Sequence, residues 1–477
     1  MKKIIAFALS LAIVVGAAPT LSNYTPDTAI VANAEDEYIK ITDNYITYRV
    51  YSDFAEVYSC SRSAQGDITI LSEVNDIPVT HIADEAFDQC FYITNINIPD
   101  SITNIGERAF FRIAVNSITI PDSVINISSE AFYASTITSI KLPNNLTSIE
   151  DGTFSDCVKL ESIILPQSIN NIGSRAFFGC EKLSTIELSQ NIRTIGGSAF
   201  ARCESLENIE VSENNDFYTS ENGVLFDKDK TKIISYPAGK SESTYTIPNN
   251  VKIIGESAFA YCKNLTSVYI PNSVTEIESD AFFENNLLTL DLPDNILSIR
   301  QRAFGYSRNL TDITIPNTLI EIGDYAFSLC TNLNSVVIED GVLEIGACAF
   351  EYCEYLTSVL IPNSVERIGR WAFSDTKWLN DKISEDEYVI VNGILIYSSV
   401  RQGDVQIPNS VKCIGDSVFF SCSLTSITIP DSVTSIGSYA FCYCTNLESI
   451  TIPDSVTSIG DYAFVSCTSL TSVTIPD

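Results

Sequence analysis

A short motif built around Ala-Phe recurs along almost the whole chain of 477 residues, and it limits the fold more than any other feature. Successive motif phenylalanines, beginning with Phe87, are mostly 22 or 23 residues apart. Two intervals are longer: Phe200 lies 59 residues before Phe259, and Phe373 lies 46 residues before Phe419. A constant period of this length is typical of repeat proteins, in which each unit packs only on its neighbours.

Each repeat unit has two arms. The first, Leu-x-x-Ile-x-Ile-Pro, alternates apolar with small polar residues, which predicts a half-buried strand that Pro ends because it cannot donate to a ladder. The second, Ser-Val-x-x-Ile-Gly-x-x-Ala-Phe, has apolar residues three and four apart, which fits a 3₁₀ turn or a tight loop that packs inward. One unit cannot bury its apolar side alone, but fifteen stacked units share a continuous core. The sequence therefore predicts a mainly β repeat solenoid rather than separate globular domains.

The composition argues against several functional classes. Hydrophobic residues make up 45% of the chain, too many for a disordered protein. The formal net charge of −32 has the wrong sign for a nucleic-acid binder, and anionic membrane surfaces would repel it. With one histidine and no recognisable catalytic carboxylate pair, phosphate loop or nucleophile elbow, the chain offers no enzyme site. We therefore expect no catalytic residues, no metal, no cofactor and no nucleic-acid partner.

Residues 1–34 have the features of an export signal. A basic start precedes the apolar run 4–18, which is too short for a membrane span. Small residues at Ala32 and Ala34 suit a cleavage site, and an acidic stretch follows. We predict a secreted or cell-surface protein whose mature chain begins at Glu35 and does not insert into a membrane.

The chain before the repeat has a different character. Residues 35–76 are rich in Tyr, Val, Ile and Thr, with strands predicted at Tyr45–Tyr51 and Asp67–Leu71. We expect this segment to be an N-terminal β cap that shields the first coil from water. The repeat solenoid is predicted to follow over residues 77–477.

Two insertions interrupt the solenoid, near residues 212–246 and 375–404. Each contains an Asn-Gly pair, Asn222-Gly223 and Asn392-Gly393, between strand-forming residues, which predicts a β-hairpin. Each insertion is either a modified coil that continues the stack or a protruding element that binds a partner.

Fourteen cysteines in an exported chain would ordinarily suggest disulfides, but their positions do not. Ten of them lie three residues after the motif Phe: Cys90, Cys157, Cys180, Cys203, Cys262, Cys330, Cys353, Cys422, Cys444 and Cys467. Equivalent side chains of a stack point the same way, which is poor disulfide geometry, so we predict free, buried thiols that hydrogen-bond a corner of the coil. Cys60, Cys348, Cys413 and Cys442 lie outside this column and leave room for one local bridge among them.

The full pattern, Cys-x-x-Leu-x-x-Ile-x-Ile-Pro-x-Ser-Val-x-x-Ile-Gly-x-x-Ala-Phe, resembles the BspA-type leucine-rich repeat of bacterial surface proteins over roughly residues 77–477. The resemblance implies a right-handed leucine-rich-repeat coil, with a parallel β-sheet on the concave face and short 3₁₀ or loop arms on the convex side. It also implies surface display, adhesion, and binding of proteins or other polymers rather than catalysis.

The residue between the last two apolar positions of each predicted strand faces away from the core. This column is mostly Thr near both ends of the repeat region, whereas its middle carries residues that repetition does not explain. They are our candidate ligand-binding residues: Lys141, Ile164, Glu187, Glu210, Tyr269, Asp291, Val337 and Leu360. Since Val, Ile and Tyr also favour strands, sequence drift is the alternative explanation.

These features predict a protein that binds an extracellular protein or polysaccharide through its concave face without catalysis. The alternative is a structural spacer or scaffold that carries a module beyond residue 477. The sequence stops at Asp477, just after a strand and without the arm that should follow. An unpaired strand edge invites pairing, so we expect either a longer protein or end-to-end self-association.

Overall fold

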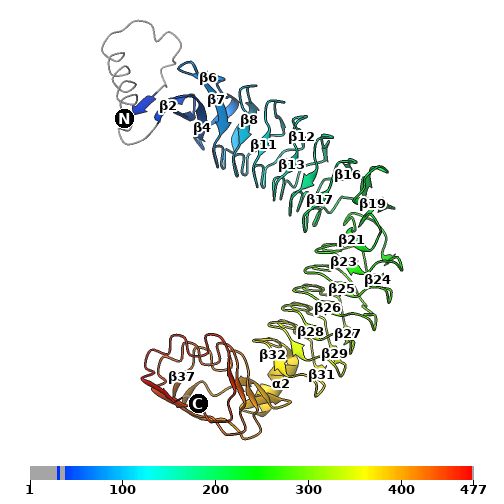
Figure 1. Cartoon of the computed structure of the whole chain (residues 1–477), viewed down its shortest axis with the longest axis vertical. Helices are drawn as coiled ribbons and strands as arrows, with labels where there is room; N and C mark the ends of the chain where they lie inside the picture. Colours follow the sequence, from blue (N-terminus) through cyan, green and yellow to red (C-terminus); the bar gives the residue numbers. More distant parts are fainter. Residues whose placement is uncertain (1–28, 33–37, 475–477) are drawn as a thin grey trace. The chain divides into compact units, whose positions relative to one another are not determined.

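The computed structural model describes residues 29–32 and 38–474 (Figure 1). The chain forms two compact units, unit 1 up to Lys228 and unit 2 from Asp229. The predicted cleavage site after Ala34 lies outside the described residues, as does the export signal except for the strand β1 (Ala29–Ala32). In each unit, coils of the chain stack through parallel strands with almost no helix, so the predicted solenoid fold is confirmed.

The Leu-x-x-Ile-x-Ile-Pro arms form one column of strands, which we name the Ile-x-Ile strands. Neighbours pair in parallel register, as Ile118 does with Ile140, and these buried residues lie between exposed polar ones. In unit 1 they are β5 (Gln65–Thr69), β8 (Tyr92–Asn97), β10 (Ser117–Thr119), β12 (Ser139–Lys141), β14 (Ser162–Ile163), β16 (Thr185–Leu188) and β18 (Asn208–Val211). In unit 2 they are β22 (Thr244–Thr246), β24 (Ser267–Tyr269), β27 (Asp312–Ile315), β29 (Ser335–Ile338), β31 (Ser358–Leu360), β35 (Gln402–Gln406), β37 (Ser423–Thr428), β39 (Ser449–Thr451) and β41 (Ser472–Thr474).

The second arms contain a further column of parallel strands, the Ile-Gly strands, most of them two residues long, which the sequence did not predict. In unit 1 they are β7 (Ile77–Ile82), β9 (Asn104–Ile105), β11 (Asn126–Ile127), β13 (Ser148–Ile149), β15 (Asn171–Ile172) and β17 (Thr194–Ile195). In unit 2 they are β21 (Lys232–Ser235), β23 (Ile253–Ile254), β25 (Glu276–Ile277), β26 (Ser298–Ile299), β28 (Glu321–Ile322), β30 (Glu344–Ile345), β32 (Arg367–Ile368), β36 (Cys413–Ile414), β38 (Ser435–Ile436) and β40 (Ser458–Ile459). The rest of each second arm is a tight turn, so the loop form of the predicted arm is the one that occurs.

The turn around the motif phenylalanine holds the coils together. Phe304 is fully buried, and its ring stacks between those of Phe282 and Phe327 at centroid distances of 5.1 and 5.2 Å. The backbone is left-handed at Arg302 (φ 54°) and Tyr306 (φ 61°), which lie two positions before and two positions after Phe304. The same two positions are left-handed in all fifteen coils.

This left-handed backbone costs an L-residue roughly 1–2 kcal/mol, yet it gives the turn three aligned donors. The amide groups of Arg302, Phe304 and Tyr306 donate to carbonyl oxygens of the next coil at 2.9, 2.8 and 2.8 Å. Every second residue of the turn therefore bonds to the neighbouring coil, as in a sheet, and these bonds offset the backbone strain.

The N-terminal segment begins with antiparallel strands. β2 (Ile39–Asp43), β3 (Ile46–Val50) and β4 (Ala55–Cys60) pair in sequence order, and β1 pairs with β2. β4 then pairs in parallel with β7, the first Ile-Gly strand, which also pairs with the short β6 (Glu73–Val74). Strands were predicted at both β3 and β5, and both are present.

Both Asn-Gly pairs form the predicted hairpins. They join β19 (Tyr218–Glu221) to β20 (Val224–Asp227) and β33 (Tyr388–Val391) to β34 (Ile394–Ser398). Inside unit 2, β21 and β34 each pair in parallel with the following Ile-Gly strand. This pairing corresponds to the prediction that each insertion is a modified coil that continues the stack. The second insertion also contains a helix that the sequence did not predict, α2 (Lys377–Glu385).

Candidate binding surface

Four of the eight predicted binding residues lie in unit 1, on or next to the Ile-x-Ile strands. Lys141 ends β12, and Ile164 follows β14 with 86% of its surface exposed. Glu187 and Glu210 are direct neighbours in the parallel strands β16 and β18, and both are exposed. The Nδ2 group of Asn208 donates to Glu210 Oε1 at 2.7 Å.

The other four lie in unit 2. Tyr269 ends β24 and is 62% exposed, and Leu360 ends β31 and is 60% exposed. Val337 and Leu360 stand side by side in the parallel strands β29 and β31. Asp291 is exposed but belongs to a coil without an Ile-x-Ile strand, which interrupts the sheet between β24 and β27. The predicted residues thus form two separate groups, one in each unit.

Unit 2 carries a second exposed apolar stripe that the sequence analysis missed. Leu297 (61% exposed), Ile320 (55%) and Leu343 (40%) each directly precede an Ile-Gly strand in three successive coils. The strands β26, β28 and β30 pair in register, so these side chains occupy equivalent positions on adjacent coils. The same column is polar on either side of the stripe, at Thr275 before it and Glu366 after it.

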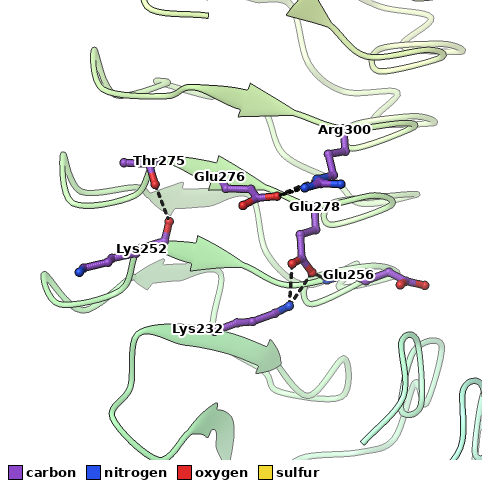
Figure 2. A network of polar contacts seen from close by, with 7 residues as sticks. All are labelled: Lys232, Lys252, Glu256, Thr275, Glu276, Glu278 and Arg300. Carbon is purple, nitrogen blue, oxygen red and sulfur yellow. Dashed lines mark hydrogen bonds and ion pairs between the residues drawn. The ribbon is translucent and has the colours of Figure 1, made fainter.

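A network of charged side chains crosses the coils that precede this stripe (Figure 2). The Nζ group of Lys232 contacts both carboxylate oxygens of Glu278 at 2.6 and 2.8 Å, and the amide of Glu256 donates to Glu278 Oε2 at 2.8 Å. Arg300 Nε donates to Glu276 Oε1 at 2.7 Å. The pair of Lys232 with Glu278 bridges across an intervening coil, and the pair of Arg300 with Glu276 links adjacent coils.

A third set of exposed apolar side chains stands on the turns of unit 2. Tyr352, Trp371, Tyr443 and Tyr462 are 43–60% exposed, and all four occupy left-handed positions beside the motif phenylalanine. The corresponding positions of unit 1 carry no Tyr, Trp or Phe. Both this set and the stripe lie outside the outward strand column in which binding residues were predicted. Their signal in the sequence is a run of apolar or aromatic residues at other equivalent positions of the repeat.

The ten motif cysteines are free, as predicted, and nine of them are buried, whereas Cys467 is half-buried. All fourteen cysteines are free, and the thiol of Cys180 donates to the carbonyl oxygen of Phe154, in the preceding coil, at 3.2 Å. Ser307 makes the same bond to Phe282 at 3.3 Å, which explains why a small polar residue replaces Cys there. Burial raises the pKa of Cys157 and Cys330 to about 12. Cys157 and Cys330 therefore have a structural role and offer no nucleophile.

Neither a metal centre nor a membrane span is evident in the part of the chain that the structure describes. Over residues 29–32 and 38–474, His, Cys, Asp and Glu nowhere form a group of three or more that could hold a metal ion. Within the same ranges, every helix is too short or too polar to cross a bilayer.

Comparisons with known proteins agree with this architecture. A family model described as "BspA type Leucine rich repeat region" matches residues 80–207, 125–242, 238–354, 297–419 and 394–477. A leucine rich cell surface protein from Faecalibacterium prausnitzii A2-165 is 28% identical, with a TM-score of 0.57, over 69% of this chain and 96% of its own. The pneumococcal vaccine antigen PcpA has the same fold, with 21% identity and a TM-score of 0.56 over 88% of this chain and 98% of its own. No curated protein matches the chain.

Proposed function

Because the chain belongs to the BspA-type leucine-rich repeat family, we propose that it is an exported, surface-associated protein that binds a macromolecular ligand without catalysis. The exposed apolar residues Tyr269 and Leu360 on the Ile-x-Ile strands of unit 2 carry this proposal. Exposed apolar patches with polar borders are typical of binding surfaces, and Tyr is among the residues that contribute most to interfaces. The cell surface protein from F. prausnitzii supports surface display.

We favour an extracellular protein over a polysaccharide as the ligand. Unit 2 offers apolar side chains on both strand columns, and aliphatic residues such as Leu360, Ile320 and Leu343 match the apolar centre of a protein interface. The face of the Ile-x-Ile strands, which we expect to be concave, is the leading candidate. The apolar stripe beside the Ile-Gly strands is the second candidate face, and the two faces must be compared in a binding assay.

The test is binding of the full chain to immobilised, purified host matrix proteins and polysaccharides. We expect the double variant Tyr269→Ser with Leu360→Ser to bind at least tenfold more weakly, while Thr451→Ser in the same column binds normally. Ile320→Ser with Leu343→Ser shows whether the second face takes part. Circular dichroism must show that each variant is folded. Unchanged binding by both double variants would contradict the assignment to these faces.

A structural spacer is the second candidate, since the two units stack many coils with few departures from the repeat. A spacer would bind none of the immobilised ligands, and both double variants would then leave surface attachment of the bacterial protein unchanged. The two functions therefore differ in a measurable way.

A further inference from the structure

One pair of cysteines departs from the contact that other motif thiols make with the preceding motif phenylalanine. Cys60 ends β4 in the N-terminal segment, and Cys90 follows the first motif phenylalanine. Their sulfur atoms lie 3.8 and 3.7 Å from the same carbonyl oxygen, that of Ser61, so the two thiols converge on one acceptor. The amide of Cys60 also donates to Ala86 O at 2.6 Å, which holds the end of β4 against the first coil.

The other motif cysteines make a different contact. The thiols of Cys157, Cys203 and Cys353 point at the carbonyl oxygens of the preceding motif phenylalanines at 3.1, 3.0 and 3.2 Å. Such a thiol is surrounded by backbone and has no sulfur as its hydrogen-bond partner. Cys60 and Cys90 instead share one acceptor, the carbonyl oxygen of Ser61.

The pair also differs from the buried column in its exposure to reagents. Cys60 is half-buried and Cys90 is buried, so a reagent reaches Cys60 first. The neighbouring Cys60 thiol lowers the pKa of Cys90 although burial and Asp88 oppose this, whereas Cys90 and burial raise the pKa of Cys60. Thiolates, not thiols, carry out disulfide exchange, so Cys90 is the more readily ionised member of the pair.

We propose that Cys60 and Cys90 form a disulfide that fastens the N-terminal strands to the first coil of the repeat. The oxidant is a low-molecular-weight disulfide or a thiol–disulfide oxidoreductase. The thiolate of one of the two cysteines attacks this disulfide, releases one thiol and forms a mixed disulfide. The thiolate of the other cysteine then attacks the protein sulfur of the mixed disulfide and releases the second thiol. Two protein thiols are thereby oxidised by two electrons while the oxidant is reduced to two thiols.

The occurrence of the Cys60–Cys90 disulfide in cells depends on the proposed export to an oxidising compartment, whereas its formation in the purified chain does not. A cross-link between residues 60 and 90 restricts the unfolded chain and stabilises the folded N-terminal segment. We therefore expect the N-terminal strands to be held on the first coil more stably in the oxidised chain than in the reduced chain.

The experiment uses the purified, fully reduced chain and oxidised glutathione. We expect the count of alkylatable thiols after denaturation to fall from fourteen to twelve. Trypsin should then release Val50–Arg62 linked to Ser63–Arg108 without reduction, and each of these peptides contains a single cysteine. Oxidation should also raise the melting temperature of the wild-type chain by several degrees, a comparison that needs no variant.

Two variants sharpen the result. Cys60→Ser should keep all thirteen remaining thiols, and its melting temperature should not respond to glutathione. Cys180→Ser, a matched change in the motif column, should fall from thirteen to eleven and give the same linked peptides. Retention of fourteen thiols by the wild-type chain, a lasting glutathione adduct on Cys60, or links between other cysteines would overturn the proposal. None of these outcomes bears on ligand binding, so the two proposals fail separately.

Discussion

The stacked phenylalanines should dominate the stability of unit 2, and Phe304→Ala tests this. The ring of Phe304 is fully buried between two others, at centroid distances of 5.1 and 5.2 Å. The coils on either side cannot close over the space left by the ring, because the amides of Phe282 and Phe304 fix their spacing through bonds of 2.7 and 2.8 Å to Ala303 O and Ala326 O. A cavity that cannot collapse puts the loss near the upper end of the Phe→Ala range, about 4–5 kcal/mol.

Phe464→Ala is the matched control. Its ring is only partly buried and stacks on that of Phe441 at 5.4 Å, so we expect a loss of about 1–2 kcal/mol. Urea unfolding followed by circular dichroism measures the change in the free energy of unfolding, and hydrogen exchange reports whether the opening is local. Equal losses in the two variants, or a loss below about 2 kcal/mol for Phe304→Ala, would refute the argument that the fixed spacing of the coils maintains the cavity.

Four further predictions follow from the packing and the sequence. Cys180→Ser should cost less than about 1 kcal/mol, because Ser307 already makes the equivalent hydrogen bond, whereas Cys180→Val removes the donor and should cost more in the same urea assay. Burial raises the pKa of Cys157 and Cys203 to about 12, above that of an unfolded thiol, so the free energy of unfolding should fall as the pH rises from about 8.5 towards 12; a flat pH profile over this range would contradict this. Gly437→Ala should destabilise the chain more than Gly403→Ala in thermal melts, since its Cβ would lie 2.7 Å from Asp416 N, while Gly403 has a positive φ of 78° but open space around it. Intact-mass analysis of the secreted protein should give a chain that begins at Glu35, and retention of the apolar N-terminus would contradict export.

The sequence was informative wherever a pattern repeats with a clear physical meaning. Alternating Ile and Thr predicted the Ile-x-Ile strands, and Asn222-Gly223 predicted a hairpin. The Ile-Gly strands escaped prediction because two residues are too few to show an alternating pattern. The left-handed turns escaped because bulky residues such as Tyr306 and Trp371 occupy positions that ordinarily favour Gly, and only the bonds between coils make that conformation acceptable.

The helix α2 escaped for a related reason. Thr376 fills the slot of the motif cysteine, and its hydroxyl donates to Phe373 O of its own coil at 2.7 Å, where Ser307 donates to the preceding coil. The same hydroxyl accepts from the amide of Leu379 at 3.2 Å and so caps the helix. One residue therefore meets the requirements of the repeat and of the helix, and the repeat pattern hid the second role. The candidate site was only partly predictable from the sequence. The exposed fraction of a side chain is needed to distinguish a binding residue such as Tyr269 from sequence drift, and that fraction depends on the folded stack.

The second insertion also contains a structural device that occurs at the start of the repeat. Gly66 and Gly403 have positive φ angles of 74° and 78°, and each is followed by an aspartate at a register shift in the sheet. Asp67 accepts a hydrogen bond from Thr94 at 2.8 Å, and Asp404 accepts one from Thr425 at the same distance.

In both places antiparallel strands come first, and a Gln-Gly-Asp strand then opens a new parallel sheet, as β5 does for β8 and β35 for β37. The Gly bulge turns the strand, and the aspartate anchors it to the first regular coil by accepting a hydrogen bond from a threonine hydroxyl. The insertion is thus a renewed start of the stack rather than an interruption of it. A search based on the motif phenylalanine could not show this, because the starting strands lie where that phenylalanine is absent.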